Sequence, residues 1–428
     1  MQTQFTDVQR QDPAIRSSEA ILRSCVHCGF CSATCPTYTL LGDELDSPRG
    51  RIYLIKDMLE NDRPATAEVV RHVDRCLSCL ACMTTCPSGV HYQHLVDHAR
   101  AHIEATYRRP WQDRWIRRGL AAVMPYPARF RVLLKLARLF SPLAPLLPRR
   151  LRAAMALVPA AVRVPPAAPE SAAGPVPAAR ARVAVMTGCV QAVLGQSANA
   201  ATRRLLERMG CEIVAIDGCC GSLTHHLGRA TETREFAAVF AGRVRQAGTE
   251  APLAAIVVNA SGCGTHLKDL GFVYRDDGPL AADTEQVSQL ARDVTEFICE
   301  AGLPPVTRPG GLRVAYHSAC SLQHGQRVEA PPRDLLRAAG YEVVEIPEGH
   351  ICCGSAGTYN MLQPELASQL AARKLANIAG LKVDVIAAGN LGCITQLATG
   401  AGQPIVHTVE LLDWATGGPM PAALAART

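Results

Sequence analysis

The sequence has no uninterrupted apolar run near the roughly 18–20 residues that a helix needs to span a membrane. The longest candidate, VLLKLARLFSPLAPLLP (132–148), is interrupted by Lys135, Arg138 and three prolines. The N-terminal stretch MQTQFTDVQRQDPAIRSSEA also lacks the apolar core of a secretory signal peptide. We therefore expect a cytoplasmic protein, either soluble or held peripherally on the cytoplasmic face of the inner membrane.

The sequence also lacks the signature of a dinucleotide-binding site. No G-x-G-x-x-G follows a predicted strand and opens a helix. No general base is combined with groups that would bind a small organic substrate. We therefore expect no flavin or nicotinamide on this chain and no catalytic residue, so any organic redox chemistry would take place on a partner protein.

Acidic residues are scarce between residues 101 and 163, where thirteen Lys/Arg accompany two Asp/Glu in a chain of net charge +6. Six of these cations alternate with Leu, Val and Phe: Arg117, Arg118, Arg129, Arg131, Lys135 and Arg138. Such a stretch suits an anionic membrane surface, a partner subunit or an ordinary solvated helix, and all three remain open. No nucleic-acid-binding motif accompanies the charge, so we expect no nucleic-acid partner.

Cysteine is abundant, with 18 residues in 428. Eight of them form two runs of equal spacing, CVHCGFCSATCP (25–36) and CLSCLACMTTCP (76–87). The pattern C-x2-C-x2-C-x3-C-P is the ligand run of bacterial ferredoxins with two [4Fe-4S] clusters, in which the fourth cysteine binds the other cluster. We assign Cys25, Cys28, Cys31 and Cys86 to cluster 1, and Cys35, Cys76, Cys79 and Cys82 to cluster 2. A structural zinc site, which is usually built from separated C-x2-C pairs, is the alternative.

Two further features accompany these runs. SPRGRIYLIKDMLE (47–60) predicts a helix that begins near Ser47 and Pro48. Arg49 and Arg51 on it could offset the negative charge of the clusters or simply be solvated. His27 lies between two ligands and is interpreted as a neighbour of the cluster rather than a ligand.

Most of the other cysteines belong to an internal repeat. RVAVMTGC, DGCCGS and AAIVVNASGC return 131, 133 and 130 residues later as RVAYHSAC, HICCGS and VDVIAAGNLGC. Each copy reads as alternating strands and helices with cysteines after strand ends, where open α/β sheets build their sites. The two resulting candidate metal-binding quartets are Cys189, Cys219, Cys220, Cys263 and Cys320, Cys352, Cys353, Cys393. Cys211 and Cys299 have no counterpart and are interpreted as buried or bystander thiols.

These patterns predict an α+β multidomain chain. Residues 1–100 form a mainly α-helical, bacterial ferredoxin-like domain with two [4Fe-4S] clusters. Residues 101–180 form a basic helical segment and a Pro/Ala-rich linker, VPPAAPESAAGPVPAAR (164–180). Residues 181–305 and 306–428 form two α/β Cys-Cys-Gly units, named here the first unit and the second unit.

Together the motifs resemble the iron–sulfur subunits of bacterial glycolate oxidase (glycolate dehydrogenase). The resemblance rests on CVHCGFCSATCPTY, DSPRGRIYLIK, CLSCLACMTTCPSGV, SGCG and HICCGSAGTYN. The ferredoxin motifs and the Cys-Cys-Gly repeats are also similar to those of the anaerobic glycerol-3-phosphate dehydrogenase small subunit, heterodisulfide-reductase-like proteins and lactate-utilisation proteins. In heterodisulfide-reductase-like proteins the last cysteine belongs to a C-x2-C pair, whose first position is here Ala260 or Asn390. Each quartet therefore has four thiols rather than five, and an ordinary cluster, a zinc site and a dithiol pair remain open.

The resemblance implies an electron-transfer subunit of a complex that oxidises glycolate to glyoxylate, and D-lactate to pyruvate. FAD would be bound by a partner flavoprotein, and the two clusters would pass electrons toward a membrane quinone or another respiratory acceptor. The alternatives are an iron–sulfur subunit of a glycerol-3-phosphate or lactate dehydrogenase, and a thiol/disulfide reductase assisted by His317 or His324. A zinc-stabilised scaffold without redox activity is the third alternative.

Overall fold

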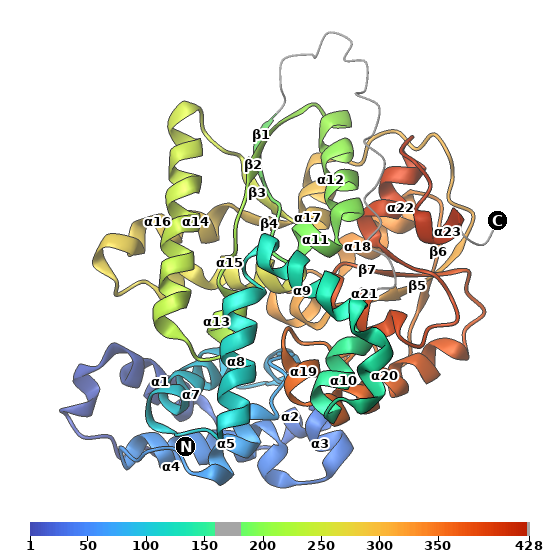
Figure 1. The fold of residues 1–428 in the computed structure, drawn as a ribbon. Helices are drawn as coiled ribbons and strands as arrows, with labels where there is room; N and C mark the ends of the chain where they lie inside the picture. Colours follow the sequence, from blue (N-terminus) through green and yellow to red (C-terminus); the bar gives the residue numbers. More distant parts are fainter. Residues whose placement is uncertain (159–180, 426–428) are drawn as a thin grey trace.

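The computed structural model describes residues 1–158 and 181–425, with the exception of the Arg149 side chain. The predicted linker at 164–180 and the end of the basic segment lie outside the described residues. Within the described ranges, helices surround two four-stranded parallel sheets in the C-terminal half, and a helical N-terminal domain lies below them (Figure 1). This arrangement confirms the predicted fold class.

The N-terminal domain consists of short helices around the two cysteine runs. They are η1 (Gln9–Gln11), α1 (Pro13–Ser24), α2 (Phe30–Ala33), α3 (Pro36–Leu41), η2 (Glu44–Asp46), α4 (Pro48–Glu60), α5 (Ala67–Asp74), α6 (Ala81–Thr85) and α7 (Tyr92–Thr106). Helix α4 begins where the sequence predicts, because the Ser47 hydroxyl accepts a hydrogen bond from Gly50 N–H and Pro48 occupies the first turn. Helices α2 and α6 each lie within one cysteine run.

The basic segment connects the N-terminal domain to both units. It forms α8 (Trp111–Val123), α9 (Pro127–Leu139), η3 (Ser141–Leu146) and α10 (Arg149–Ala156). Arg109 and Arg117 are buried and both donate to Asp74 of α5, at 2.5 Å and 2.9 Å. Arg117 therefore does not belong to an exposed basic stripe, because its charge is neutralised inside the protein.

The two units repeat one topology. The first sheet contains β1 (Ala181–Met186), β2 (Cys211–Ile216), β3 (Ala255–Val258) and β4 (Ala291–Asp293) in the order β2-β1-β3-β4. The second contains β5 (Arg313–His317), β6 (Glu342–Glu345), β7 (Val385–Ala388) and β8 (Ile405–His407) in the order β6-β5-β7-β8. All pairings are parallel, so the strand ends that carry cysteines lie at the same edge of each sheet.

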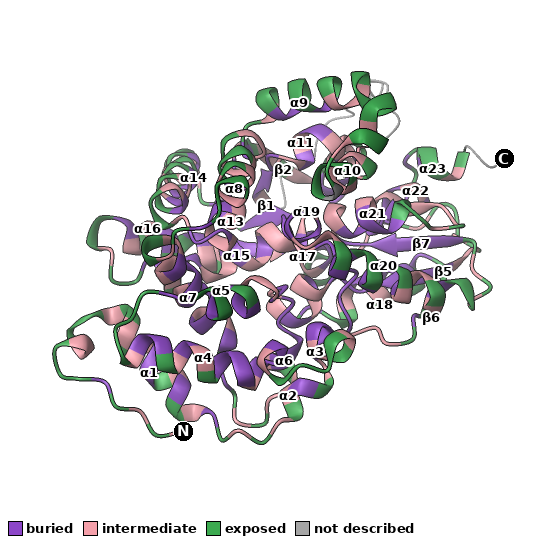
Figure 2. Ribbon diagram, turned by 60° about the horizontal axis from the view of Figure 1, so that its bottom comes forward, coloured by how far each residue is buried: buried purple, intermediate pink, exposed green. Residues whose placement is uncertain are grey.

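Helices of widely different length connect the strands of the two units. The first unit has α11 (Gln191–Leu194), α12 (Gln196–Arg208), α13 (Ser222–His226), α14 (Ala230–Glu250), α15 (Ser261–Val273), α16 (Gly278–Leu290) and α17 (Val294–Ala301). The second has η4 (Ser321–Gly325), α18 (Ala330–Ala338), α19 (Tyr359–Leu362), α20 (Pro364–Ala379), α21 (Leu391–Ala398), α22 (Thr408–Ala415) and α23 (Ala422–Ala425). The central strands are buried, whereas the outer side of α9 is exposed (Figure 2).

One apolar core extends through both units. It includes Leu205 of α12, Leu336 of α18 and Leu412 of α22, all fully buried. At the same interface, His407 Nε2 lies 2.9 Å from the Asn259 carbonyl oxygen. The two units therefore pack against each other as halves of one body, which fixes the positions of their cysteine-bearing edges.

Candidate iron–sulfur and thiol sites

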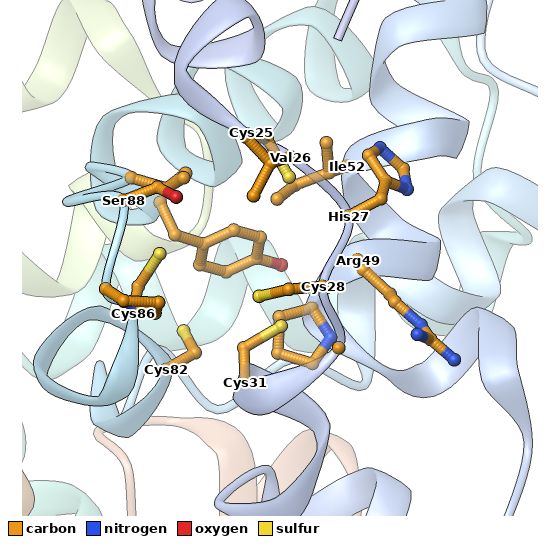
Figure 3. A pocket seen from close by; sticks show the side chains of 15 residues that line it. Cys25, Val26, His27, Cys28, Cys31, Arg49, Ile52, Cys82, Cys86 and Ser88 are labelled. Carbon is orange, nitrogen blue, oxygen red and sulfur yellow. The ribbon is translucent and has the colours of Figure 1, made fainter.

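The cluster 1 cysteines surround one cavity. Cys25, Cys28 and Cys31 lie on one side of it, and Cys82 and Cys86 lie on the other (Figure 3). The second run thus approaches the first, as the crossed assignment of Cys86 requires. Cys82, which we assign to cluster 2, also lines this cavity, so the division of the eight ligands between the clusters stays a prediction.

The cluster 2 cysteines are buried and receive polar contacts. Ser78 N–H donates to Cys76 Sγ at 3.4 Å, and the Tyr92 hydroxyl donates to the same sulfur at 3.7 Å. Burial raises the pKa of the Cys79 thiol, and neighbouring cysteines including Cys35 raise it further. Converging thiols with donors aimed at sulfur fit a thiolate-bound cluster, since metal binding removes the thiol protons.

A buried arginine stands beside cluster 2. Arg51 is 1% exposed, and its Nη1 lies 3.8 Å from Cys35 Sγ. The same guanidinium donates to the His72 carbonyl at 2.7 Å and to Asp46 at 3.2 Å. Asp46 also binds Arg75 at 2.6 Å. The sequence singled out Arg51, but not Asp46 or His72, because these partners come from other segments and carry no motif.

The other features noted near the first run lie at its edge. His27 is half-buried at the cavity wall, and burial lowers its pKa. Arg49 also lines the cavity, but its guanidinium is paired with Glu44, with an Nη2–Oε2 distance of 3.1 Å. Arg51 is therefore the more deeply buried of the two arginines and the one paired with a buried carboxylate.

The first quartet comes together at the edge of the first sheet. Cys189 follows β1, Cys219 and Cys220 follow β2, and Cys263 lies in the first turn of α15 after β3. Hydrogen bonding to Cys219, together with burial, raises the pKa of the Cys189 thiol. At Cys220 the hydrogen bond with Cys219 lowers the pKa, but the hydrogen bond with Cys263 and burial outweigh it and raise the pKa. The four thiols therefore lie at one edge of the sheet, and their role as a metal site stays a prediction.

The second quartet meets in the same way. Cys320 Sγ lies 3.6 Å from Cys352 Sγ, and Cys353 interacts with both Cys352 and Cys393. Asn390 Nδ2 donates to Cys393 Sγ at 3.5 Å. Asn390, which occupies the position of a fifth cysteine in heterodisulfide-reductase-like proteins, therefore contacts the site without supplying a thiolate.

A glycine closes each Cys-Cys pair. Gly354 adopts a φ of 88°, and a Cβ there would lie 2.4 Å from the Ala367 carbonyl oxygen. Gly221 adopts a φ of 89°, facing the Thr233 carbonyl. Both glycines are needed for the left-handed backbone that turns the second thiol into the site.

The second quartet adjoins cluster 2. Cys79 and Cys352 belong to one apolar cluster with Ile351 and Tyr359. The Tyr359 hydroxyl donates to the Arg75 carbonyl oxygen at 3.0 Å, and Thr84 Oγ1 lies 2.8 Å from His324 Nδ1. This proximity could not be read from the sequence, because the contacts join residues more than two hundred positions apart.

A group of half-buried and buried histidines joins α7 to the first unit. His225 Nε2 lies 3.0 Å from Asp97 Oδ2, and the His225 and His266 rings are 4.9 Å apart. The Asp97 carboxylate raises the pKa of His225 against the opposing effect of burial, whereas burial lowers the pKa of His226 to about 4. The sequence did not reveal this ion pair, which ties the ferredoxin-like domain to the first unit.

The two unmatched cysteines lie elsewhere in the first unit. Cys211 begins β2, and Cys299 is exposed on α17. Cys211 packs against the core that both units share. The interpretation of Cys299 as a buried thiol is therefore wrong, and Cys211 is only half-buried. That neither cysteine takes part in a site stays a prediction.

Known proteins resemble the chain along its whole length. The 4Fe-4S dicluster domain matches residues 21–90, and the cysteine-rich domain matches residues 183–268 and 314–398. The glycolate oxidase iron-sulfur subunit of Escherichia coli (strain K12) is 39% identical over 97% of this chain and 99% of its own length. This chain belongs to the glycolate oxidase iron–sulfur subunit family. The probable glycolate oxidase iron-sulfur subunit of Bacillus subtilis (strain 168) is 30% identical over 94% of this chain and 96% of its own length.

More distant similarities cover parts of the same architecture. Lactate utilization protein A of Oceanobacillus iheyensis is 24% identical over 54% of this chain and 96% of its own length. The crystal structure of a hypothetical protein from Helicobacter pylori superposes on 99% of this chain and on 75% of that protein's own chain. The TM-score is 0.56 and the sequence identity is 11%, so the two proteins share the fold. Family membership and the dicluster match confirm the predicted resemblance and the pair of [4Fe-4S] clusters. Among the helices of the described residues, none has both the length and the apolar character that crossing a membrane requires.

Proposed function

We propose that this chain is the electron-transfer subunit of a complex that oxidises glycolate to glyoxylate, and D-lactate to pyruvate. The observation that carries the proposal is the continuous set of cysteine sites, from the exposed Cys28 through cluster 2 to the second quartet, in a member of this family. A flavin on the partner takes two electrons from a hydroxy acid as a hydride, and iron–sulfur clusters pass electrons singly.

The protein side chains control access to the sites. Tyr92 and Ile52 are buried and line the inner wall of the cluster 1 cavity. Cys28 lies at the surface, next to Val26 and Phe30, which are 67% and 61% exposed. We propose that the flavoprotein docks on this apolar edge, because electron transfer requires a short path to the nearest cluster.

The outer side of α9 and η3 is the part of the chain best suited to a membrane. Its exposed apolar residues are Val132, Leu133, Leu136, Leu139, Phe140, Leu143 and Leu146. Arg129, Arg131 and Lys135 are exposed on the same helix, whereas Phe130 and Leu134 anchor it on α11. Apolar residues flanked by cations suit an anionic lipid surface, and we propose peripheral contact there at the cytoplasmic face of the inner membrane, with delivery of electrons to a quinone.

A flotation assay tests the membrane contact. We expect the chain to float with vesicles that contain anionic lipid and to be released by salt. A Leu133→Glu, Leu136→Glu variant should stay at the bottom of the gradient, whereas Val239→Glu, at an exposed position on α14, should float normally. No flotation of the unchanged chain would exclude a membrane role for α9.

Co-purification followed by metal analysis tests the electron-transfer function. We expect a flavoprotein to co-purify, and at least about eight irons and eight acid-labile sulfides per chain from the two [4Fe-4S] clusters. A chain that purifies alone, with zinc in place of iron, would contradict the proposal.

Thiol/disulfide reduction is the second candidate function. The 3.6 Å contact between the Cys320 and Cys352 sulfurs favours it. However, Cys352, Cys353 and His317 are about 1–2% exposed, so a disulfide substrate cannot reach them without local opening. Turnover of a disulfide substrate by the chain without a flavoprotein would support this candidate.

A further inference from the structure

The second unit contains buried polar groups where the first unit is apolar. His317 is the last residue of β5, and Met186 is the last residue of β1, three positions before the first cysteine of each quartet. Phe240 and Lys374 also occupy corresponding positions. Each lies seven residues after the residue whose carbonyl faces the glycine of the Cys-Cys-Gly motif, Thr233 in the first unit and Ala367 in the second. All four side chains are at least 98% buried. The two quartets therefore differ in their surroundings although their thiols correspond.

His317 points at the second quartet. Its ring nitrogen and the sulfurs of Cys353 and Cys393 all lie within 4.8 Å of one another. His317 Nε2 is buried and has no hydrogen-bond partner in the part of the chain that the structure describes. An unpaired buried imidazole nitrogen is costly unless something binds it, and imidazole is a common metal ligand beside thiolates.

Lys374 supplies compensating charge at the same place. Its ammonium donates to the Glu348 carbonyl at 2.6 Å and interacts electrostatically with Cys352, Cys353 and Cys393. A buried ammonium needs a negative partner. The Glu348 carboxylate is one such partner. Four thiolates on a metal centre would provide further negative charge, whereas four neutral thiols would not.

We propose that the second unit binds an iron–sulfur centre with His317 as a ligand beside Cys320, Cys352, Cys353 and Cys393. His317 supplies the fifth donor that the missing C-x2-C cysteine would otherwise give. His317, Cys353 and Cys393 converge, and Cys320 and Cys352 form an adjoining pair. These five potential donors exceed the four that a structural zinc ion takes, so a centre with more than one metal atom fits better. The position against cluster 2 suits a redox centre. The inference rests on the proposed electron-transfer function.

Nitrogen spectroscopy on the intact complex tests the ligand directly. Protein labelled with 15N-histidine is reduced and examined by pulsed EPR, and we expect strong coupling to a coordinated histidine nitrogen. His317→Ala should abolish this coupling and lower the iron content toward the eight atoms of the N-terminal clusters. Met186→Ala, the matched change in the first unit, should leave both unchanged.

A conservative variant separates ligation from folding. His317→Cys should keep the iron and lose the nitrogen coupling, because a thiolate replaces the imidazole. Three results would overturn the inference. They are nitrogen coupling that persists in His317→Ala, an absence of strong coupling in the unchanged complex, and zinc in place of iron at the second unit. If the EPR signals of cluster 1 and cluster 2 are present in those cases, the proposed electron-transfer function is unaffected. If the signals of these two clusters are absent, that function itself is contradicted.

Discussion

The charge of Arg51 should set the reduction potential of cluster 2. Arg51→Met keeps an unbranched side chain that can fill the stem of the arginine site, but it removes the positive charge 3.8 Å from Cys35 Sγ. With an effective dielectric constant of about 20, a unit charge at about 4–8 Å contributes about 4–2 kcal/mol. For the transfer of one electron, this free energy corresponds to a potential difference of about 170–90 mV. Because the added electron is spread over the cluster, we expect the lower part of this range, a fall of about 100 mV.

An EPR-monitored redox titration measures this change. Arg51→Lys should restore most of the potential because it keeps the charge. Arg75→Met, which removes the other cation on Asp46, should have a smaller effect because Arg75 is 28% exposed and better screened by water. Loss of Arg51 also leaves Asp46 with fewer partners, so we expect destabilisation of about 3 kcal/mol, and only protein with full iron content is compared. An unchanged cluster 2 potential, or a larger shift at cluster 1, would refute the reasoning.

Three further predictions concern other parts of the molecule. Cys35→Ser should damage the cluster of the second run more than that of its own run, as seen by EPR spin counting; equal damage would disprove the crossed assignment. Val26→Glu should slow reduction by the flavoprotein several-fold in stopped-flow experiments without altering iron content, and an unchanged rate would place docking elsewhere. His407 is fully buried, and burial lowers its pKa to about 4. Since the unfolded chain binds a proton at this histidine more readily than the native state, the contribution of His407 to stability should fall by about 2 kcal/mol from pH 7 to pH 5. His407→Asn, which retains a helix cap, should reduce the loss of stability over this range by the same amount in urea titrations.

Much of the fold could be predicted because it depends on local and repeated patterns. Ser47 and Pro48 mark the start of α4, and the spacing of the Cys-Cys-Gly motifs defines two units of equal topology. The same repetition led us to expect two thiol quartets, since parallel strands bring their ends to one edge.

The remaining parts of the sites depend on contacts between distant segments. The burial of Arg117 follows from Asp74, which lies outside the basic segment. The contact between Cys79 and the second unit likewise depends on how the domains pack. Composition and motif spacing carry no information about such packing, so the basic segment looked more uniformly exposed than it is.

Reduction of the clusters by substrate tests the central claim most directly. The purified complex is mixed anaerobically with glycolate, frozen and examined by EPR, beside the isolated chain treated in the same way. The account predicts reduced [4Fe-4S] signals in the complex and none in the isolated chain. Clusters that stay oxidised while the partner's flavin becomes reduced would contradict it.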